Sequence, residues 1–309
     1  MVTSGIGRNF RHRLARRSFI AGISIVAGLG FLAGLTPTAA ADLLKDHTVN
    51  FSETDPALAD AVGVHQWGFT EIRSVVIFDD PTGTSFTEYI VGRYDTFSGT
   101  PPHSDPVAVP GYRAEHEITL VMGVQGTSTP FMPGVGSEFT FENILFGEIW
   151  HDSGAGYTPS TYSDLSSFRD GTLVQELVDP SAPFELGGGT VSPVNTLEQF
   201  SGHFTLQSEV QDLLAAGFQS AFRDFDDNMV SPDPLLGIAS GNFTRILEGE
   251  AGIIDDFQAF FGFDHNPDSQ EAFVLQSGGQ YRMAIPEPSA LVLVGVGAGL
   301  ILCRRSQRA

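Results

Sequence analysis

The sequence predicts a mainly β protein whose antiparallel sheets form a sandwich or jelly-roll-like body. Short apolar segments with period-two alternation recur along the chain, and many contain phenylalanine, of which there are 25. Turn clusters rich in Gly and Pro separate these segments, as in DDPTGT (79–84) and LGGGTVSP (186–193). Helices do not alternate with the strands, as they would in a parallel sheet, so antiparallel pairing is favoured.

The predicted elements follow one another between residues 55 and 285. The strands are 71–78, 84–94, 116–123, 137–150, 172–178, 202–207, 243–249, 257–263, 271–276 and 280–285. One amphipathic helix is predicted over 208–225, because Ser208 and Gln211 have the spacing of a capping box and the apolar residues that follow share one helical face. A second, short helix is expected to begin at Asp55, with Pro56 in its first turn.

Charge is distributed unevenly along the chain, whose formal net charge is −21. Of the 37 acidic residues, all except Glu287 lie between Asp42 and Ile285, whereas half of the 16 lysines and arginines lie in the two terminal segments. Such an excess of negative charge repels phosphate backbones and anionic membrane surfaces. Nucleic acid is therefore excluded as a partner of the body.

These patterns divide the chain into three parts. Residues 1–41 are expected to be a signal peptide, residues 42–285 an acidic β-rich extracellular domain, and residues 286–309 a C-terminal sorting segment with a short transmembrane helix. The Gly-rich stretch at 186–193 is the best candidate for a break within the body.

The N-terminal segment has the three regions of an export signal. An arginine-rich stretch precedes an apolar segment from 19 to 35, and small residues that include Ala39 and Ala41 follow it. The A-x-A rule predicts cleavage by signal peptidase after Ala41. A retained membrane helix is the alternative, but the glycines of the apolar segment weaken it.

Within this segment, RRSFIA (16–21) resembles the twin-arginine export motif through Arg16, Arg17 and Phe19. Ala15 and Ala21 replace the hydroxyl residue and the lysine that are usual in that motif. Ordinary export of unfolded chains also tolerates such arginines. Both export routes therefore remain open.

The C-terminal segment combines Pro286-Glu287-Pro288, an apolar run of 13 residues and the pair Arg304 and Arg305. As a helix the run would be about 20 Å long, which is short against about 30 Å of hydrocarbon. The three parts in this order resemble the PEP-CTERM sorting signal of exported bacterial proteins. The resemblance implies that an exosortase-type transpeptidase removes the tail after the protein has been anchored transiently in the inner membrane.

The single cysteine, Cys303, lies in this tail. A body without the tail would therefore have no disulfide, no thiolate metal site and no cysteine nucleophile. Lipidation of Cys303 at the membrane edge is an alternative role for it.

Two acidic loops are the candidate metal sites, with calcium as the only cofactor considered. They present oxygen ligands at alternate positions: Asp224, Asp226 and Asn228 in the first, and Asp264, Asn266 and Asp268 in the second. Neither loop has the glycine and the bidentate glutamate of an EF-hand. Solvated carboxylates in Asx turns are the competing interpretation.

The sequence carries no motif of a known catalytic site, so an enzyme is not predicted. It has no G-x-S-x-G elbow, no H-E-x-x-H pair and no nucleotide loop with a lysine. Glu142 and Glu148 share a face of one predicted strand, but they would lie roughly 20 Å apart, too far to flank one glycosidic bond.

The functional expectation is an exported protein of the cell surface or extracellular matrix, with a structural or interaction role in the envelope or exopolysaccharide. Its expected partners are the export machinery, signal peptidase, the exosortase-type transpeptidase and exopolysaccharide. One alternative is a carbohydrate-binding module, for which exposure of Trp67 and Trp150 would be the sign. Another is a polysaccharide-acting enzyme, which needs two carboxylates about 5 to 10 Å apart in one cleft.

Overall fold

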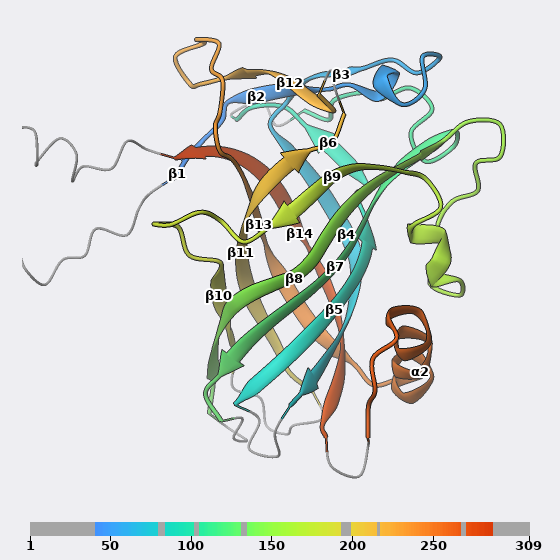
Figure 1. Ribbon diagram of the computed structural model, residues 1–309, viewed down its shortest axis with the longest axis vertical. Coiled ribbons are helices and arrows are strands. Elements are labelled where there is room, and N and C mark those ends of the chain that lie inside the picture. The colour runs from blue at the N-terminus through green and yellow to red at the C-terminus, as the bar shows by residue number, and fades with distance from the viewer. Residues whose placement is uncertain are drawn as a thin grey trace, which may run out of the picture. The chain divides into compact units, whose positions relative to one another are not determined.

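Eight antiparallel strands close into a barrel in the computed structural model, and a small three-stranded sheet lies at one end of it (Figure 1). The structure describes residues 41–79, 84–101, 105–130, 135–192, 199–214, 217–266 and 270–286. Around the barrel the order is β4 (Gln66–Phe78), β5 (Ser85–Arg93), β7 (His116–Ser128), β8 (Ser137–Ser153), β10 (Gly187–Val191), β11 (Ser201–Asp212), β13 (Leu235–Ile246) and β14 (Ala272–Pro286). The last strand, β14, pairs with the first, β4, and so closes the barrel.

Shorter elements complete the described chain. They are β1 (Ala41–Leu43), β2 (Asp46–Val49), β3 (Ala61–Val64), β6 (Thr96–Ser98), β9 (Thr172–Val178), β12 (Gln219–Arg223), the 3-10 helices η1 (Phe51–Glu53) and η2 (Leu165–Phe168), and the α-helix α2 (Glu250–Phe261). The small sheet has the order β12, β2, β3. β9 and β10 both pair with β8 and β11, with β9 lying beyond the end of β10. The stretch 186–193, where a break within the body was predicted, contains β10.

The prediction of a mainly β, antiparallel protein is confirmed, whereas the arrangement differs from a sandwich or jelly roll. The difference lies in one long-range pairing, in which β14 joins β4 with Val274 opposite Val75. Residues some 200 positions apart pair in this ladder, and the local sequence of neither strand specifies which strand it pairs with. Closure leaves no exposed edge between these two strands.

The helix predicted over 208–225 is wrong. Ser208 and Gln211 lie in β11, which continues to Asp212, and β12 begins at Gln219. Glu209 pairs with Leu236 on one side and with Val178 on the other. Two ladders therefore satisfy the backbone here, and this tertiary pairing overrides the helical spacing of the apolar residues.

The helix that forms, α2, overlaps the predicted strand 257–263, which is also wrong. Ile254 and Phe257 are its buried residues and lie three positions apart, on one helical face. Gly262 ends the helix in the left-handed region, with φ of 73°, and its N–H bonds to the carbonyl of Gln258. The buried residues of the segment therefore have helical spacing, and a glycine follows its last turn. The several phenylalanines in 257–263 are also typical of a strand, which is why a strand was predicted here.

The short helix expected at Asp55 is also wrong. A 3-10 turn, η1, precedes this position, and the backbone N–H of Asp55 bonds to the carbonyl of Phe51. The Asp55 carboxylate accepts the N–H of Ala57, as in an Asx turn. The two stretches predicted at 271–276 and 280–285 are parts of one strand, β14.

A second apolar core lies outside the barrel wall. Outward residues such as Val75 on β4, Val91 on β5 and Val121 on β7 pack with Phe168 of η2 and Phe257 of α2. This wall is therefore buried on both faces, with α2 beside it in Figure 1. Burial on both faces explains why β7 reads as a continuous apolar run.

The terminal motifs lie almost wholly outside the described residues. This holds for Arg16, Arg17, Phe19, Ala39, Glu287, Pro288, Arg304 and Arg305. Ala41 and Pro286 are described, and they are paired residues of β1 and β14. Within the described part of the chain, no helix combines the length and the apolar character that crossing a membrane requires.

Candidate ligand cavity inside the barrel

An apolar cavity of about 100 Å³ lies inside the barrel. Aromatic side chains dominate its lining, together with aliphatic residues such as Ile72 and Leu120. The phenylalanines among the lining residues are Phe69, Phe78, Phe86, Phe139, Phe141, Phe200, Phe204, Phe243 and Phe273. The abundance of phenylalanine in the sequence thus has a structural use, because these rings surround one interior space.

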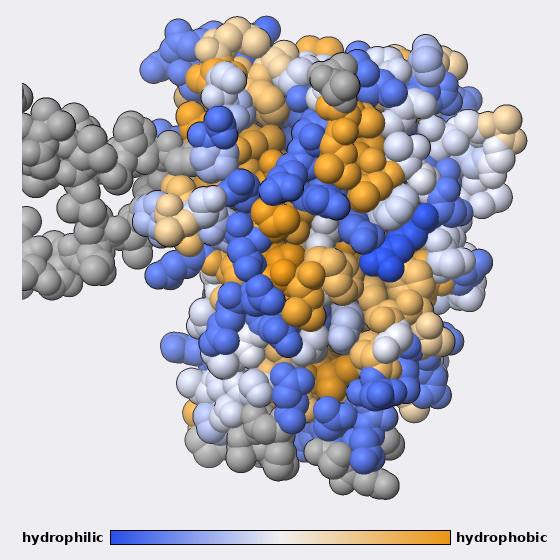
Figure 2. Space-filling view, in the orientation of Figure 1, coloured by the Kyte–Doolittle hydropathy of each residue, from blue (hydrophilic) through white to orange (hydrophobic). Residues whose placement is uncertain are grey.

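Strand alternation places these side chains inside. On β5, Phe86, Glu88 and Ile90 line the cavity, whereas Tyr89 points outward and stacks on Phe263, with 4.5 Å between ring centroids. The face of the molecule in Figure 2 has a different character, since hydrophilic residues there are interspersed with separate groups of hydrophobic ones. The cavity lining, in contrast, is mostly apolar.

A bulge in β4 changes which residues face inward. Phe69 pairs with Gly279 and Ile72 with Ser277, so two residues of β4 stand opposite the single Gly278. Phe69 and Ile72 both line the cavity, although residues three positions apart on a regular strand face opposite sides of the sheet. Without this extra residue, either Trp67 and Phe69 or the cavity-lining residues farther along β4 would face outward.

Near the small sheet, the barrel is filled by aromatic side chains. Trp67 is 0% exposed and contacts Tyr94 edge to face, with 5.0 Å between ring centroids. Its indole Nε1–H donates to Nε2 of His47 at 3.2 Å, and His47 belongs to β2 of the small sheet. Phe51 and Phe218 contact each other and continue this packing at the end of the barrel near the small sheet. We call this group of five residues the aromatic plug.

Two further histidines form a buried chain of polar contacts beside the plug. His116 Nδ1 and His151 Nε2 are 3.0 Å apart, His151 Nδ1 contacts Thr54 Oγ1, and His116 Nε2 lies 3.3 Å from the carbonyl of Pro110. Burial lowers the pKa of His151 to about 3, and it also lowers the pKa of His116. Both rings are therefore neutral near pH 7. If His116 donates its Nε2–H to Pro110 and His151 donates its Nε2–H to His116, then Nδ1 of His151 is an acceptor. It shares the one hydroxyl hydrogen of Thr54 with the carbonyl of Phe51, which lies 3.0 Å from Thr54 Oγ1.

Glu88 is the carboxyl group among the described lining residues of the cavity. It pairs with Val76 on β4 and with Val124 on β7, so apolar side chains flank it on both neighbouring strands. Burial raises the pKa of Glu88 to about 7, and the Ser74 hydroxyl moderates the rise. Ser74 is 2% exposed, and its Oγ forms no hydrogen bond of normal geometry.

The sequence itself carries a sign of this inward-facing glutamate. In TSFTEYIVGRY the glutamate alternates with Phe86 and Ile90, so the predicted strand already placed Glu88 on its apolar face. A charged residue at an inward position of a strand is uncommon unless it is paired or functional.

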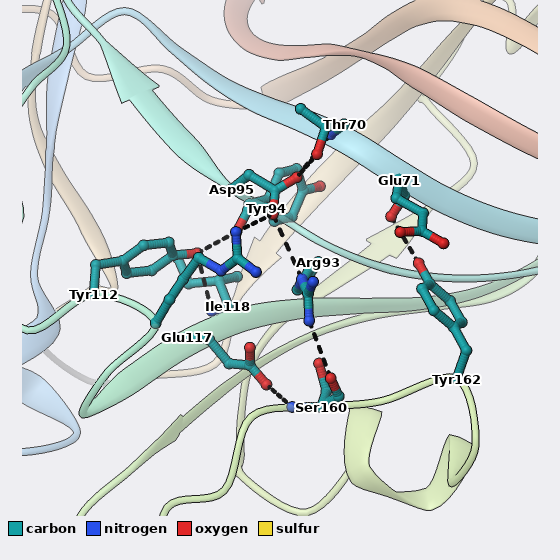
Figure 3. Close-up of polar contacts among 11 residues, drawn as sticks. Thr70, Glu71, Arg93, Tyr94, Asp95, Tyr112, Glu117, Ile118, Ser160 and Tyr162 are labelled. Atoms are coloured by element: carbon teal, nitrogen blue, oxygen red, sulfur yellow. Dashed lines mark hydrogen bonds and ion pairs between the residues drawn. The ribbon is translucent and has the colours of Figure 1, made fainter.

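A polar cluster on the outer side of the wall is the second candidate (Figure 3). The Asp95 carboxylate accepts the N–H of Thr70 at 2.7 Å and lies 3.1 Å from Nη1 of Arg113. Arg93 lies 3.5 Å from the same carboxylate and donates to the carbonyl of Ser160 at 3.1 Å. The N–H of Ser160 in turn donates to the fully buried Glu117 at 2.5 Å.

These contacts have a structural explanation. Ser160 belongs to the segment that precedes η2, and Tyr162, two residues later, donates its hydroxyl to the carbonyl of Glu71 at 2.7 Å (Figure 3). The polar cluster therefore fastens this segment to β4, β5 and β7, and the outer core under η2 continues the contact.

The first calcium candidate is a loop that satisfies its own polar groups. Asp224 accepts the backbone N–H of Asp226 at 2.9 Å and of Asn228 at 2.8 Å, and it also accepts the side-chain amide of Asn228. These bonds, first those from Asn228, lower the pKa of Asp224. Lys45 pairs with the neighbouring Asp227. The arrangement is that of an Asx turn at an exposed loop.

The second calcium candidate is described only in part. Asp264 and Asn266 belong to the described residues, whereas Asp268 lies outside them. The N–H of Asn266 donates to Oε1 of Gln270 at 3.0 Å. In the described part of the chain, no group of three or more His, Cys, Asp or Glu side chains is arranged to hold a metal ion. Calcium binding stays a prediction.

The residues considered for carbohydrate chemistry are dispersed. Trp67 lies in the aromatic plug, and the half-buried Trp150 donates to Glu148 at 3.0 Å. Glu148 also pairs with Arg169 at 2.7 Å. Glu142 is exposed and accepts the hydroxyl of Thr127. These contacts do not place an exposed tryptophan or a pair of free carboxylates in one cleft.

Neither a protein-family model, nor a curated protein, nor a solved structure matches this chain. What characterises the protein therefore comes from its own residues. These are a closed barrel, an apolar cavity lined by phenylalanine, and a single carboxyl group, the half-buried Glu88, among the described residues that line that cavity.

Proposed function

We propose that the chain is an exported surface or extracellular-matrix protein whose barrel binds a small apolar molecule. The binding role rests on the apolar cavity of about 100 Å³ inside the barrel. Apolar cavities of about 150 Å³ in other proteins stay dry and take up benzene or xenon. A cavity of comparable size can accept a molecule of a few carbon atoms, or one end of a longer molecule, and transfer from water favours such binding.

Toluene tests the binding role because it is apolar, uncharged and small. We expect toluene to bind the processed protein and to raise its melting temperature, as measured by calorimetry. Ala239 lines the cavity, so Ala239→Phe should fill part of the space and weaken toluene binding about tenfold or more, a loss of roughly 1.4 kcal/mol.

The matched control is Ala259→Phe, which makes the same change at an exposed position of α2. This variant should bind toluene as the unchanged protein does. Absence of toluene binding, or equal binding by the Ala239→Phe variant, would contradict a ligand site in the barrel.

Export and sorting are the second part of the proposal. They rest on the signal-like residues 1–41 and on the PEP-CTERM-like residues 286–309. The pairing of Ala41 with Pro286 supports them, since both terminal segments join the body at one pair of strands. A body whose two ends are adjacent can be held at one membrane surface during export. A structural or interaction role in the exopolysaccharide matrix is compatible with this location.

Changing Pro286, Glu287 and Pro288 to alanine tests the sorting signal. If a transpeptidase reads this motif, the variant should keep the apolar run and the arginines that follow. Intact mass spectrometry of protein from cells and medium of the native host measures this directly. Ser289→Ala, immediately beside the motif, is the control, and normal removal of the tail from the triple variant would defeat the assignment.

The carbohydrate alternatives gain no support from the residues proposed for them. Trp67 is fully buried, and Glu88 is the single carboxyl group among the described residues that line the cavity. A glycosidase would need a second carboxylate there.

A further inference from the structure

We propose that the cavity prefers small organic ammonium ions, meaning protonated amines with an apolar substituent, over neutral and anionic molecules of the same shape. This inference rests on the proposed ligand-binding function and names the class of ligand. It is carried by Glu88, the carboxyl group among the described lining residues, by the Ser74 hydroxyl beside it and by the aromatic rings that line the same cavity.

The charge of the lining favours a cation. Glu88 is its ionisable carboxyl group, and the described lining residues include no lysine, arginine or histidine. A carboxylate ligand, such as a fatty acid, would therefore face Glu88 without a counter-charge, at a high cost in an apolar space. An ammonium ion would find its counter-charge in Glu88.

Ser74 supplies a second acceptor. It pairs with Ile90, two residues from Glu88 on the inward face of β5, so its side chain and that of Glu88 are diagonal neighbours. Its hydroxyl is buried and lowers the pKa of Glu88, so it lies close to that carboxyl group. An ammonium group has several N–H donors, and two of them can be satisfied by Glu88 and Ser74 together.

Aromatic rings stand next to this pair. Phe86 is two residues before Glu88 on the same face, and its ring centroid lies 6.3 Å from that of Phe78 and 6.3 Å from that of Phe141. The faces of aromatic rings attract cations, and aromatic cages are a recurring way to bind ammonium groups. The same rings receive the apolar substituent of the amine.

The net charge of the whole protein also favours cations over anions. A formal net charge of −21 raises the concentration of cations near the surface and lowers that of anions. This effect is weakened by salt, whereas the contact with Glu88 inside the barrel is screened much less. Salt therefore separates attraction by the surface from recognition in the cavity.

Binding of an ammonium ion is linked to the proton on Glu88. Burial raises the pKa of Glu88 to about 7, so at lower pH the carboxyl group is largely neutral and must release its proton before it can pair with the ligand. Tyr94 is the other titratable group among the described lining residues, and burial raises its pKa far above neutrality. Affinity for an ammonium ion should therefore rise with pH.

The test compares three ligands of one shape: benzylamine, toluene and benzoate, titrated calorimetrically into the processed protein. Near pH 8, benzylamine should bind about tenfold more tightly than toluene, and benzoate more weakly than either. Between pH 5.5 and 8 the affinity for benzylamine should rise by about tenfold or more, following ionisation of Glu88. In Glu88→Gln the ratio of benzylamine to toluene affinity should fall to about one, and Ser74→Ala should lower it by a smaller factor.

Glu142→Gln is the matched control, since it removes one exposed carboxylate from the barrel strand β8 and leaves the cavity unchanged. It should preserve the ratio of the two affinities. Toluene binding without a preference for benzylamine would overturn this inference and leave the proposed ligand function standing. If none of the three molecules binds, both the ligand function and the preference for ammonium ions are wrong. If Glu88→Gln and Glu142→Gln lower the ratio equally, the preference arises from the surface charge of the protein and not from the cavity, which would also overturn this inference.

Discussion

Replacing Trp67 by alanine should lower the free energy of unfolding by about 4 kcal/mol. The indole is 0% exposed and contacts the rings of Tyr94, Phe97 and Tyr281. Its removal leaves a cavity in the aromatic plug and takes away the donor to His47. The loss of packing and the loss of a buried hydrogen bond act in the same direction.

Denaturant unfolding at constant pH measures this change, and Trp67→Phe separates its two causes. Phenylalanine keeps an aromatic ring in the plug but cannot donate to His47, so we expect a loss of about 1 to 2 kcal/mol. A loss below about 1 kcal/mol for Trp67→Ala would mean that the plug is not part of the cooperative core. Equal losses for both variants would assign the effect to the hydrogen bond alone.

Glu88 should make the protein less stable as pH rises. The pKa of this group is about 7 in the folded protein against an ordinary value of 4.5, so the folded state holds the proton more tightly. Its stabilising contribution is therefore fully present below about pH 4.5 and is lost as pH rises through about 7. The shift corresponds to a loss of about 3 kcal/mol across that window.

Glu88→Gln isolates this contribution. Glutamine has nearly the same shape and no titratable proton, so the stability of this variant relative to the unchanged protein should increase from pH 4.5 to pH 8. The comparison is needed because buried His47 and His151, whose pKa values are lowered to about 3, act in the opposite direction. Their effect lowers stability as pH falls below about 6.5, and it is common to both proteins.

Thermal or denaturant unfolding at several pH values measures the difference. Glu142→Gln should follow the unchanged protein at every pH, because Glu142 is exposed. A difference between the Glu88→Gln variant and the unchanged protein that does not vary with pH would show that Glu88 titrates at its ordinary pKa.

Much of the fold was predictable from local patterns. Alternation identified most barrel strands, including the segments that form β4, β5, β7 and β8, since period-two burial is a property of each strand by itself. Residues 208–225 were not predictable in this way. Their apolar spacing fits a helix, and only the ladders with β9 and β13 make Ser208 to Asp212 a strand.

The candidate site was predictable in part. The alternation of Phe86, Glu88 and Ile90 already placed a glutamate on an apolar face. Whether that face meets solvent, a second sheet or the interior of a barrel depends on the pairing of β14 with β4. The histidines were scattered in sequence, and only the fold brings His116 and His151 within 3.0 Å of each other.

Composition and local period show the antiparallel β class, the acidic body and two terminal segments that resemble sorting signals, because these features are read without knowledge of contacts. Closure of the sheet, the position of the phenylalanines around one cavity and the position of Glu88 within it became visible only in the folded chain. Each of these depends on strands that are distant in sequence. Their pairing is chosen by the burial of all faces together and by long-range register, which no single segment encodes.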